Sequence, residues 1–142
     1  MKKKWKYLIL TIVVLIVVGI PSGFIYVLNN GNPYTKHLNN KYVPAHLSEQ
    51  GIKKDELKIA SYGEPSYLIN EDYYHGHYMV IFKDEPNTTY YYGVKKKEKD
   101  VVQFCEKDVL GKDGVTDDTE KKTKHSEESC DYAFKNRKFD KE

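Results

Sequence analysis

The sequence predicts an α+β domain carried on an N-terminal transmembrane helix. Three observations support this fold class: an uncharged apolar run over residues 7–28, helical spacing of apolar residues over 34–50, and a period of two after residue 57. A helix followed by consecutive strands with short turns predicts one helix packed on an antiparallel sheet of about four strands. The predicted organisation is a membrane anchor (1–28), a linker (29–33), an extracytoplasmic α+β domain (34–106) and a charged, flexible, largely disordered tail (107–142).

The charge balance of the chain argues against a nucleic-acid partner. The 142 residues include 23 basic and 21 acidic side chains, for a net charge of +2. Four of the basic residues lie at the N-terminus (Lys2, Lys3, Lys4 and Lys6), so 19 basic residues face 21 acidic ones in the remainder. Binding to nucleic acid requires a clustered basic surface that displaces counterions from phosphates, and a near-neutral body does not predict one.

The N-terminal segment is long enough to serve as a membrane anchor. Tyr7 to Leu28 gives 22 uncharged residues, or about 33 Å as a helix, against a hydrocarbon core of about 30 Å. Trp5, Tyr7 and Tyr26 stand near the ends of this run, where aromatic residues favour the interface. The predicted lipid contact is therefore residues 7–28.

A cleaved signal peptide is the alternative reading of the same segment. The most apolar stretch, 8–20, has 13 residues, and Pro21-Ser22-Gly23 resembles a helix break before a cleavage site, but no Ala-x-Ala pattern follows. We favour the retained anchor. Four lysines precede the run, and only Lys36 and Lys41 fall in the next 20 residues, which places the N-terminus in the cytoplasm and the domain outside the cell membrane.

The first element of the domain is predicted to be a helix over residues 34–50. One face carries the spacing of three to four that a helix requires (Tyr34, Leu38, Tyr42 and Ala45). Pro44 is expected to kink or divide the helix. Gly51 predicts its end, with Ile52 packing back on the last turn.

Four strands are predicted after the helix: 57–62, 77–83, 88–94 and 101–105. The second strand has two apolar faces, one of which carries Tyr78, Val80 and Phe82, so we expect it to be central. Asp84-Glu85-Pro86-Asn87 is interpreted as a tight turn and 95–100 as a charged turn. After Glu106 the chain is rich in charge, which predicts a mobile tail with one short helix near 126–138.

Candidate binding residues surround the first hairpin. Tyr90, Tyr91 and Tyr92 could form a stacking platform for sugars or peptides, although tyrosines on strands more often fill a half-buried surface. Asp84 and Glu85 beside them could act as acid and base, but neighbours on a tight turn diverge and stay solvated. We therefore predict binding rather than catalysis at these five residues.

No metal or cofactor site is predicted. His75 and His77 would share a face on a strand, but no third ligand has motif spacing. Cys105 and Cys130 are the only cysteines; outside the membrane they could pair, and free thiols are the alternative. On the chain-entropy model an unstrained bond across this loop would contribute about 3–4 kcal/mol.

The order of several short motifs is similar to that of a known family. They are the Lys-rich start with a single span, Asn32-Pro33-Tyr34, Leu47 through Gly51-Ile52, Asp55-Glu56-Leu57, VIFKDEPNTTYYYG (80–93) and Val101-Val102-Gln103. In this order, over about residues 1–105, they resemble the domain-of-unknown-function family DUF3139 of Gram-positive bacteria. The resemblance implies a small membrane-anchored protein with no assigned activity. The order of helix and strands also resembles cystatin-like or PepSY-like modules.

The sequence favours a non-enzymatic binding or regulatory domain at the cell envelope. Its partner would be a surface protein or a wall component, contacted by the tyrosine-bearing sheet face. The alternatives are a hydrolase acting on wall or peptide substrates through Asp84, Glu85 and His77, and an immunity-type inhibitor protein.

Overall fold

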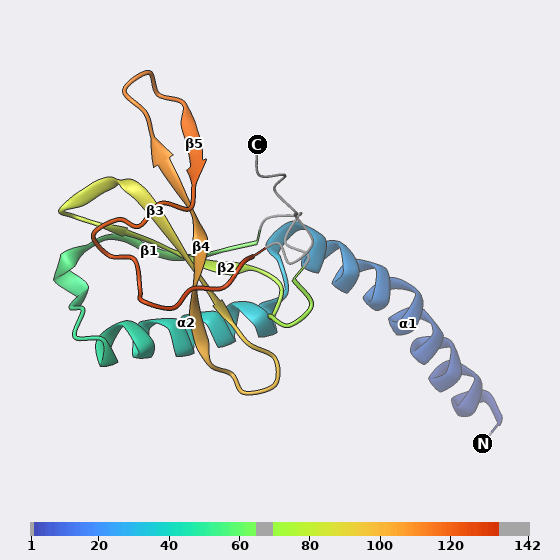
Figure 1. Ribbon diagram of the computed structural model, residues 1–142. Helices are drawn as coiled ribbons and strands as arrows, with labels where there is room; N and C mark the ends of the chain where they lie inside the picture. The colour runs from blue at the N-terminus through green and yellow to red at the C-terminus, as the bar shows by residue number, and fades with distance from the viewer. Residues whose placement is uncertain (1, 65–69, 134–142) are drawn as a thin grey trace. The chain divides into compact units, whose positions relative to one another are not determined.

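The computed structural model describes residues 2–64 and 70–133 of the chain (Figure 1). It divides into two compact units, one up to Pro33 and one from Tyr34 onward. Each unit is described by itself below.

The first unit is a helix, α1, over Lys2–Asn30. Its 29 residues correspond to a length of about 44 Å. Pro21 lies inside this helix, so the break that the signal-peptide reading placed at Pro21-Ser22-Gly23 does not form. The helix is long and apolar enough to cross a membrane by length and composition, a test that a signal sequence passes as well.

The second unit contains an antiparallel sheet in which, over the described residues, five strands follow one another in sequence order. The strands are β1 (Leu57–Gly63), β2 (His77–Phe82), β3 (Glu85–Val94), β4 (Val101–Leu110) and β5 (Thr116–Thr119). All adjacent pairs are antiparallel. The predicted α+β class is confirmed, and the predicted set of about four strands is extended by β5. The likeness to cystatin-like or PepSY-like modules stays a prediction.

Helix α2, Pro33–Glu49, lies across one face of the sheet (Figure 1). Its buried residues are Thr35, Leu38, Asn39, Val43 and Leu47. The predicted apolar face is therefore wrong in part, because Tyr34 and Ala45 are exposed. Two polar residues replace them: the Thr35 hydroxyl lies 3.0 Å from the Tyr62 hydroxyl, and the Asn39 amide donates to the Thr35 carbonyl. These bonds satisfy the Thr35 hydroxyl and the Asn39 NH₂ group, whereas the buried Asn39 side-chain oxygen has no partner among the described residues.

Helix α2 ends at its C-terminus in the way that the sequence predicted. Gly51 has φ +81°, the left-handed conformation that favours glycine. The Ile52 N–H donates to the Leu47 carbonyl at 2.9 Å, and the Gly51 N–H donates to the Ser48 carbonyl at 3.0 Å. These two bonds form a Schellman motif. The prediction that Pro44 divides the helix is wrong, since α2 continues through it.

The main core lies between α2 and the sheet. Its buried members are Val43, Leu47, Tyr78, Val80, Phe82, Tyr90, Tyr92 and Val94. On β2 and β3 these residues alternate along the strand, which places them on the face that α2 covers. The central position predicted for β2 is confirmed by its neighbours β1 and β3.

A second cluster lies on the opposite face of the sheet. It contains the buried Tyr73, Phe104 and Ala133, with Tyr91 and Val102 packed against them. Gly93 of β3 lies beneath this cluster, and a Cβ at that position would come within 2.4 Å of the Phe104 ring and 2.7 Å of Tyr73. The absent side chain at this strand position therefore lets two aromatic rings approach the backbone.

The first hairpin turns one residue earlier than the sequence predicted. Lys83 and Asp84 form the turn, and Phe82 pairs with Glu85, so Glu85, Pro86 and Asn87 belong to β3. The pairing of β2 and β3 is irregular between Val80 and Phe82. Pro86 lies on β3 opposite this irregularity, where a missing N–H is tolerated.

The prediction of a disordered tail is wrong for residues 107–133. β4 extends five residues beyond Cys105, and β5 pairs with its end through Leu110 and Thr116. Residues 120–133, here called the strap, then return along the sheet. No helix forms over 126–133, and the remainder of the helix predicted at 126–138 lies outside the described residues.

Candidate functional site

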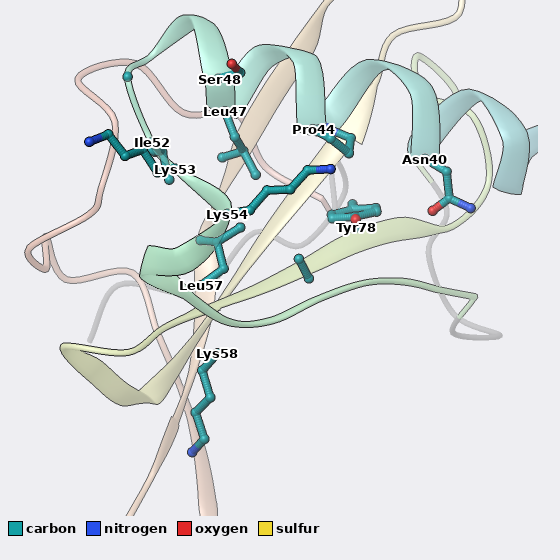
Figure 2. A pocket seen from close by; sticks show the side chains of 12 residues that line it. Asn40, Pro44, Leu47, Ser48, Ile52, Lys53, Lys54, Leu57, Lys58 and Tyr78 are labelled. Carbon is teal, nitrogen blue, oxygen red and sulfur yellow. The ribbon is translucent and has the colours of Figure 1, made fainter.

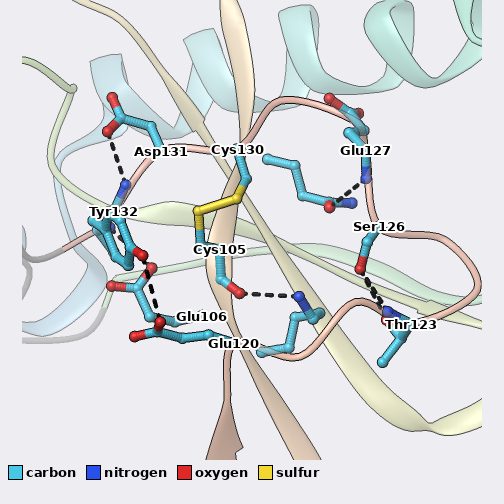
Figure 3. Close-up of a disulfide and its surroundings, with 12 residues drawn as sticks. Cys105, Glu106, Glu120, Thr123, Ser126, Glu127, Cys130, Asp131 and Tyr132 are labelled. Atoms are coloured by element: carbon cyan, nitrogen blue, oxygen red, sulfur yellow. Dashed lines mark hydrogen bonds between the residues drawn. A yellow bond between two sulfur atoms is a disulfide. The ribbon is translucent and has the colours of Figure 1, made fainter. Parts of the chain in front are cut away.

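The strap is fastened to β4 by the disulfide between Cys105 and Cys130 (Figure 3). The two Cα atoms lie 5.1 Å apart. The Cys105 N–H donates to the Asp131 carbonyl at 2.9 Å, and the Ala133 N–H donates to the Glu106 carboxylate at 3.1 Å. The structure thus contains the disulfide that the sequence left open, and the charged Glu106, directly before the predicted tail, has a partner on the strap.

The strap packs on one flank of α2 and covers part of it, leaving a hollow of about 470 Å³ beside the C-terminal end of the helix. The His46 ring of α2 lies 2.9 Å from the Glu127 carboxylate, and this hydrogen bond raises the pKa of His46. The His125 ring stacks on Phe82 with centroids 3.7 Å apart. Near them the Gln103 amide donates to the Tyr92 hydroxyl and to the His125 carbonyl, and its oxygen accepts from the Glu127 N–H. The strap therefore forms part of the wall of the main core.

Four of the five predicted binding residues take part in this packing. Tyr90 and Tyr92 are 0% and 1% exposed, so neither ring can stack on a ligand. The Tyr90 hydroxyl lies 2.5 Å from the Glu85 carboxylate, and burial together with this carboxylate raises the pKa of Tyr90 to about 12. Asp84 accepts hydrogen bonds from Lys124 and from His125, which lower its pKa to about 2. The Asp84 side chain stays 45% exposed, as expected, although Lys124 and His125 of the strap bind it. Glu85 departs from the expectation, because it is partly buried and accepts a hydrogen bond from Tyr90 of the core.

The fifth predicted residue, Tyr91, lies on the opposite face. Its ring is tilted against His77 with centroids 4.5 Å apart, and its hydroxyl donates to Asp108 at 2.6 Å. The three tyrosines therefore alternate between two packed faces, and the exposed platform that the sequence suggested is not formed by them.

The two histidines considered as metal ligands have separate surroundings. His75 Nδ1 lies 3.0 Å from the Glu64 carboxylate. His77 is buried, and burial lowers its pKa to about 4. Among the described residues, no group of three His, Cys, Asp or Glu side chains is arranged to hold a metal ion.

The other flank of α2 is an open groove between the helix and β1 (Figure 2). Its volume is about 860 Å³. The lining residues are Asn40, Pro44, Leu47, Ser48, Gly51, Ile52, Lys53, Lys54, Leu57, Lys58, Ala60 and Tyr78. The groove exists because Ala60, which pairs with the fully buried Val80, is too small to fill the space between β1 and α2.

The groove combines an apolar floor with basic residues. Leu47 and Tyr78 form parts of the floor, and Figure 2 shows the Lys54 side chain running along the groove beside Pro44. Lys53 lies at its end, whereas the Lys58 side chain projects from β1 away from α2 (Figure 2). The Lys58 ammonium donates to the Pro86 carbonyl at 3.4 Å. The described lining holds these three lysines and no carboxylate or histidine, so the site can attract an anion but offers no acid–base pair.

Sequence reasoning missed the groove. It named none of the lining residues as a candidate, because the search followed aromatic and acidic clusters. The available signals were a lysine pair, Lys53-Lys54, just after the helix stop, and the small Ala60 in a strand of larger residues. Neither signal specifies a groove until the register of β1 and the position of α2 are known.

Comparison with known proteins places the chain in a family. The model of a protein family of unknown function, DUF3139, matches residues 2–92, so the chain belongs to this family and the resemblance of its motifs is confirmed. No curated protein and no solved structure matches the chain. All groove residues fall within the matched part, whereas β4, β5 and the strap fall beyond it.

Proposed function

We propose that this member of the DUF3139 family is a membrane-anchored protein whose extracytoplasmic domain binds a partner in the groove between α2 and β1. The observation that carries the proposal is the groove itself, with its apolar floor, two lysine side chains and a volume of about 860 Å³. Ligand sites are typically concave, largely apolar and supplied with a few polar groups. The position of the groove within the part of the chain shared with the family supports its assignment as the functional site.

The proposed topology places the N-terminus in the cytoplasm and the α+β domain outside. Four lysines precede the apolar run of α1, which favours retention of that end on the inner side. The disulfide between Cys105 and Cys130 also supports an external domain, because such bonds persist in oxidising compartments. The retained helix α1 would hold the domain at the cell membrane.

The proposed activity is binding without catalysis. The hydrolase alternative assigned Asp84, Glu85 and His77 to one site, but His77 lies on the opposite face of the sheet from the cluster that holds the two acids. Asp84 contacts the strap, Glu85 contacts Tyr90, and His77 stacks on Tyr91 on the opposite face of the sheet. An immunity-type inhibitor would be one form of a binding protein, with a toxin or protease as the partner.

Site-specific crosslinking on intact cells tests the proposed function. A photo-crosslinking amino acid is placed at position 40, where Asn40 is exposed on the groove, and at position 110 as a control, where Leu110 is 46% exposed on β4. We expect a discrete adduct from position 40 and none from position 110. Equal adducts at both positions, or none at position 40, would contradict a binding site in the groove.

The topology has its own measurement. A membrane-impermeant amine reagent on intact cells should label lysines of the domain, such as Lys96 and Lys97, and leave Lys2 to Lys6 unlabelled. Labelling of the N-terminal lysines alone would overturn the proposed orientation.

A further inference from the structure

We infer that the partner in the groove is an extended protein segment that pairs with β1 as an added strand and carries carboxylates toward the lysines. This inference rests on the proposed function and specifies the chemistry of the partner. Three observations carry it: the outer edge of β1, the place of the groove beside that edge, and the charge of the lining.

The two ends of the sheet differ in how well they resist pairing with another chain. β5 has four residues, of which Asp117 and Asp118 are acidic, and a short charged edge is protected against strand addition. β1 has seven residues, or about 23 Å, and Lys58 is its one charged residue. Within the described part of the chain, β1 pairs with β2 alone. Over the described residues, the other edge of β1 therefore has no strand beside it, and Lys58 to Ser61 on it are exposed.

The groove lies where alternate side chains of an added strand would enter. Ala60 and Tyr62 pair with Val80 and Tyr78 of the main core, so this side of the sheet faces α2. A strand added next to β1 would send every second side chain to the same side, into the space lined by Pro44 and Leu47. Recognition by strand addition has this form, in which backbone bonds give affinity and side-chain pockets give specificity.

The charge of the lining selects acidic segments. The side chains of Lys53 and Lys54 line the groove, whereas that of Lys58 points away from α2 and donates to the Pro86 carbonyl at 3.4 Å (Figure 2). Asp55 and Glu56 of the neighbouring turn do not line it, and the Glu56 carboxylate instead accepts from the Lys53 N–H at 3.4 Å. Among the side chains that enter the groove, apolar ones above Ala60 and a carboxylate at the position that reaches Lys54 give the complementary pattern.

The test begins with a selection of displayed random peptides on the full chain in lipid nanodiscs, after removal of peptides that bind empty nanodiscs. We expect enriched sequences in which apolar and acidic residues recur at every second position, because only those side chains enter the groove. A synthetic peptide of the enriched sequence is then methylated on the backbone nitrogens of its odd or its even residues. One methylated peptide should bind about tenfold or more weakly than the other, because only one set of N–H groups faces β1. Equal binding of both peptides overturns strand pairing.

Two matched variants test the role of charge. Lys53→Ala/Lys54→Ala should weaken binding of the unmethylated peptide by about tenfold. Lys96→Ala/Lys97→Ala removes the same charge at exposed positions away from the groove and should leave its affinity unchanged. Equal weakening by both variants overturns the assignment of the carboxylates to the groove. Both variants are checked for unchanged thermal unfolding.

The results separate this inference from the proposed function. A crosslinked partner at position 40, with no preference between the methylated peptides, refutes strand addition and leaves the binding site standing. Poly(glycerol phosphate) that binds through Lys53 and Lys54 while peptides do not would instead assign the groove to a wall polymer. Crosslinks from position 40 to a second copy of the chain would also overturn the inference.

Discussion

The two flanks of α2 are treated differently by the same chain. Five strands spaced about 4.8 Å apart span about 19 Å, whereas a helix with its side chains is about 10–12 Å wide. One helix therefore leaves part of the sheet face uncovered on each side. The strap covers part of the flank over β3 and β4, and the groove remains on the flank over β1.

The contrast shows what closing a flank requires. On the strap flank the chain supplies a stacked His125 ring, hydrogen bonds to two core tyrosines and a disulfide. On the groove flank Ala60 leaves the floor open and lysines line the space. Residues that close a core and residues that leave a site open thus occupy opposite sides of one helix. Variants on the two flanks should accordingly affect different properties, stability on one and binding on the other.

The largest effect on stability is expected from the disulfide. Replacement of Cys105 and Cys130 by alanine removes a cross-link across a separation of 25 residues, which should lower the free energy of unfolding by about 3–4 kcal/mol. Denaturant unfolding of the full chain in micelles measures the change, and the wild type in reductant is the control. A loss below about 1 kcal/mol would show that the strap needs no covalent fastening.

A smaller effect is expected from the buried amide beneath the strap. Gln103→Leu keeps the approximate size of the side chain but leaves the Tyr92 hydroxyl, the His125 carbonyl and the Glu127 N–H without their partner. The free energy of unfolding should fall by about 2–3 kcal/mol. Ala60→Leu, which fills part of the groove, is the matched change on the other flank and should alter it by about 0.5 kcal/mol or less. Similar losses in both variants would remove the distinction between the flanks.

The smallest expected effect is a pH dependence in how stably the strap is held against α2. The hydrogen bond to Glu127 raises the pKa of His46, so its contribution is fully present below the unfolded value of about 6.5 and is lost as the pH rises through the folded value. After correction for the intrinsic effect of pH on exchange, the amides of residues 123–129 should therefore exchange faster at pH 8 than at pH 6. The corresponding change in the free energy of local opening should be below about 1 kcal/mol. His77, with a pKa of about 4, stays neutral over this range.

The control for this measurement is His46→Gln, which removes the titrating ring. Exchange in the variant should lose its excess dependence on pH between 6 and 8. A variant that keeps the full dependence would assign the effect to another group on the strap.

Local sequence patterns predicted the helices and strands better than they predicted how the strap packs on them. Alternation identified β2 and β3, and Gly51 with Ile52 identified the end of α2. The tail was misread because polar residues there are satisfied by partners distant in sequence, such as Glu106 with Ala133 across 27 residues. Composition reports how many charges a segment has but not which of them will be bonded.

The candidate site was misread for a related reason. A run of three tyrosines predicts a strand, but which face of that strand is covered depends on where α2 and the strap lie. Tyr90 and Tyr92 were named as ligand contacts, and both belong to the main core. The groove depends on the small side chain of Ala60, which leaves space between β1 and α2. No pattern of residue types along the chain indicates where such a space stays unfilled.

The position of the strap along the chain has a consequence for synthesis and export. A polypeptide emerges N-terminus first, so all five strands are available before Thr123 and His125 appear. Until then the Tyr90 hydroxyl and the Phe82 ring that they cover face water. Cys130 follows later still, and its pairing with Cys105 then fixes a segment that has already docked. The domain is therefore completed from its C-terminal side, and an oxidant that acted before the strap emerged would find Cys105 without its partner.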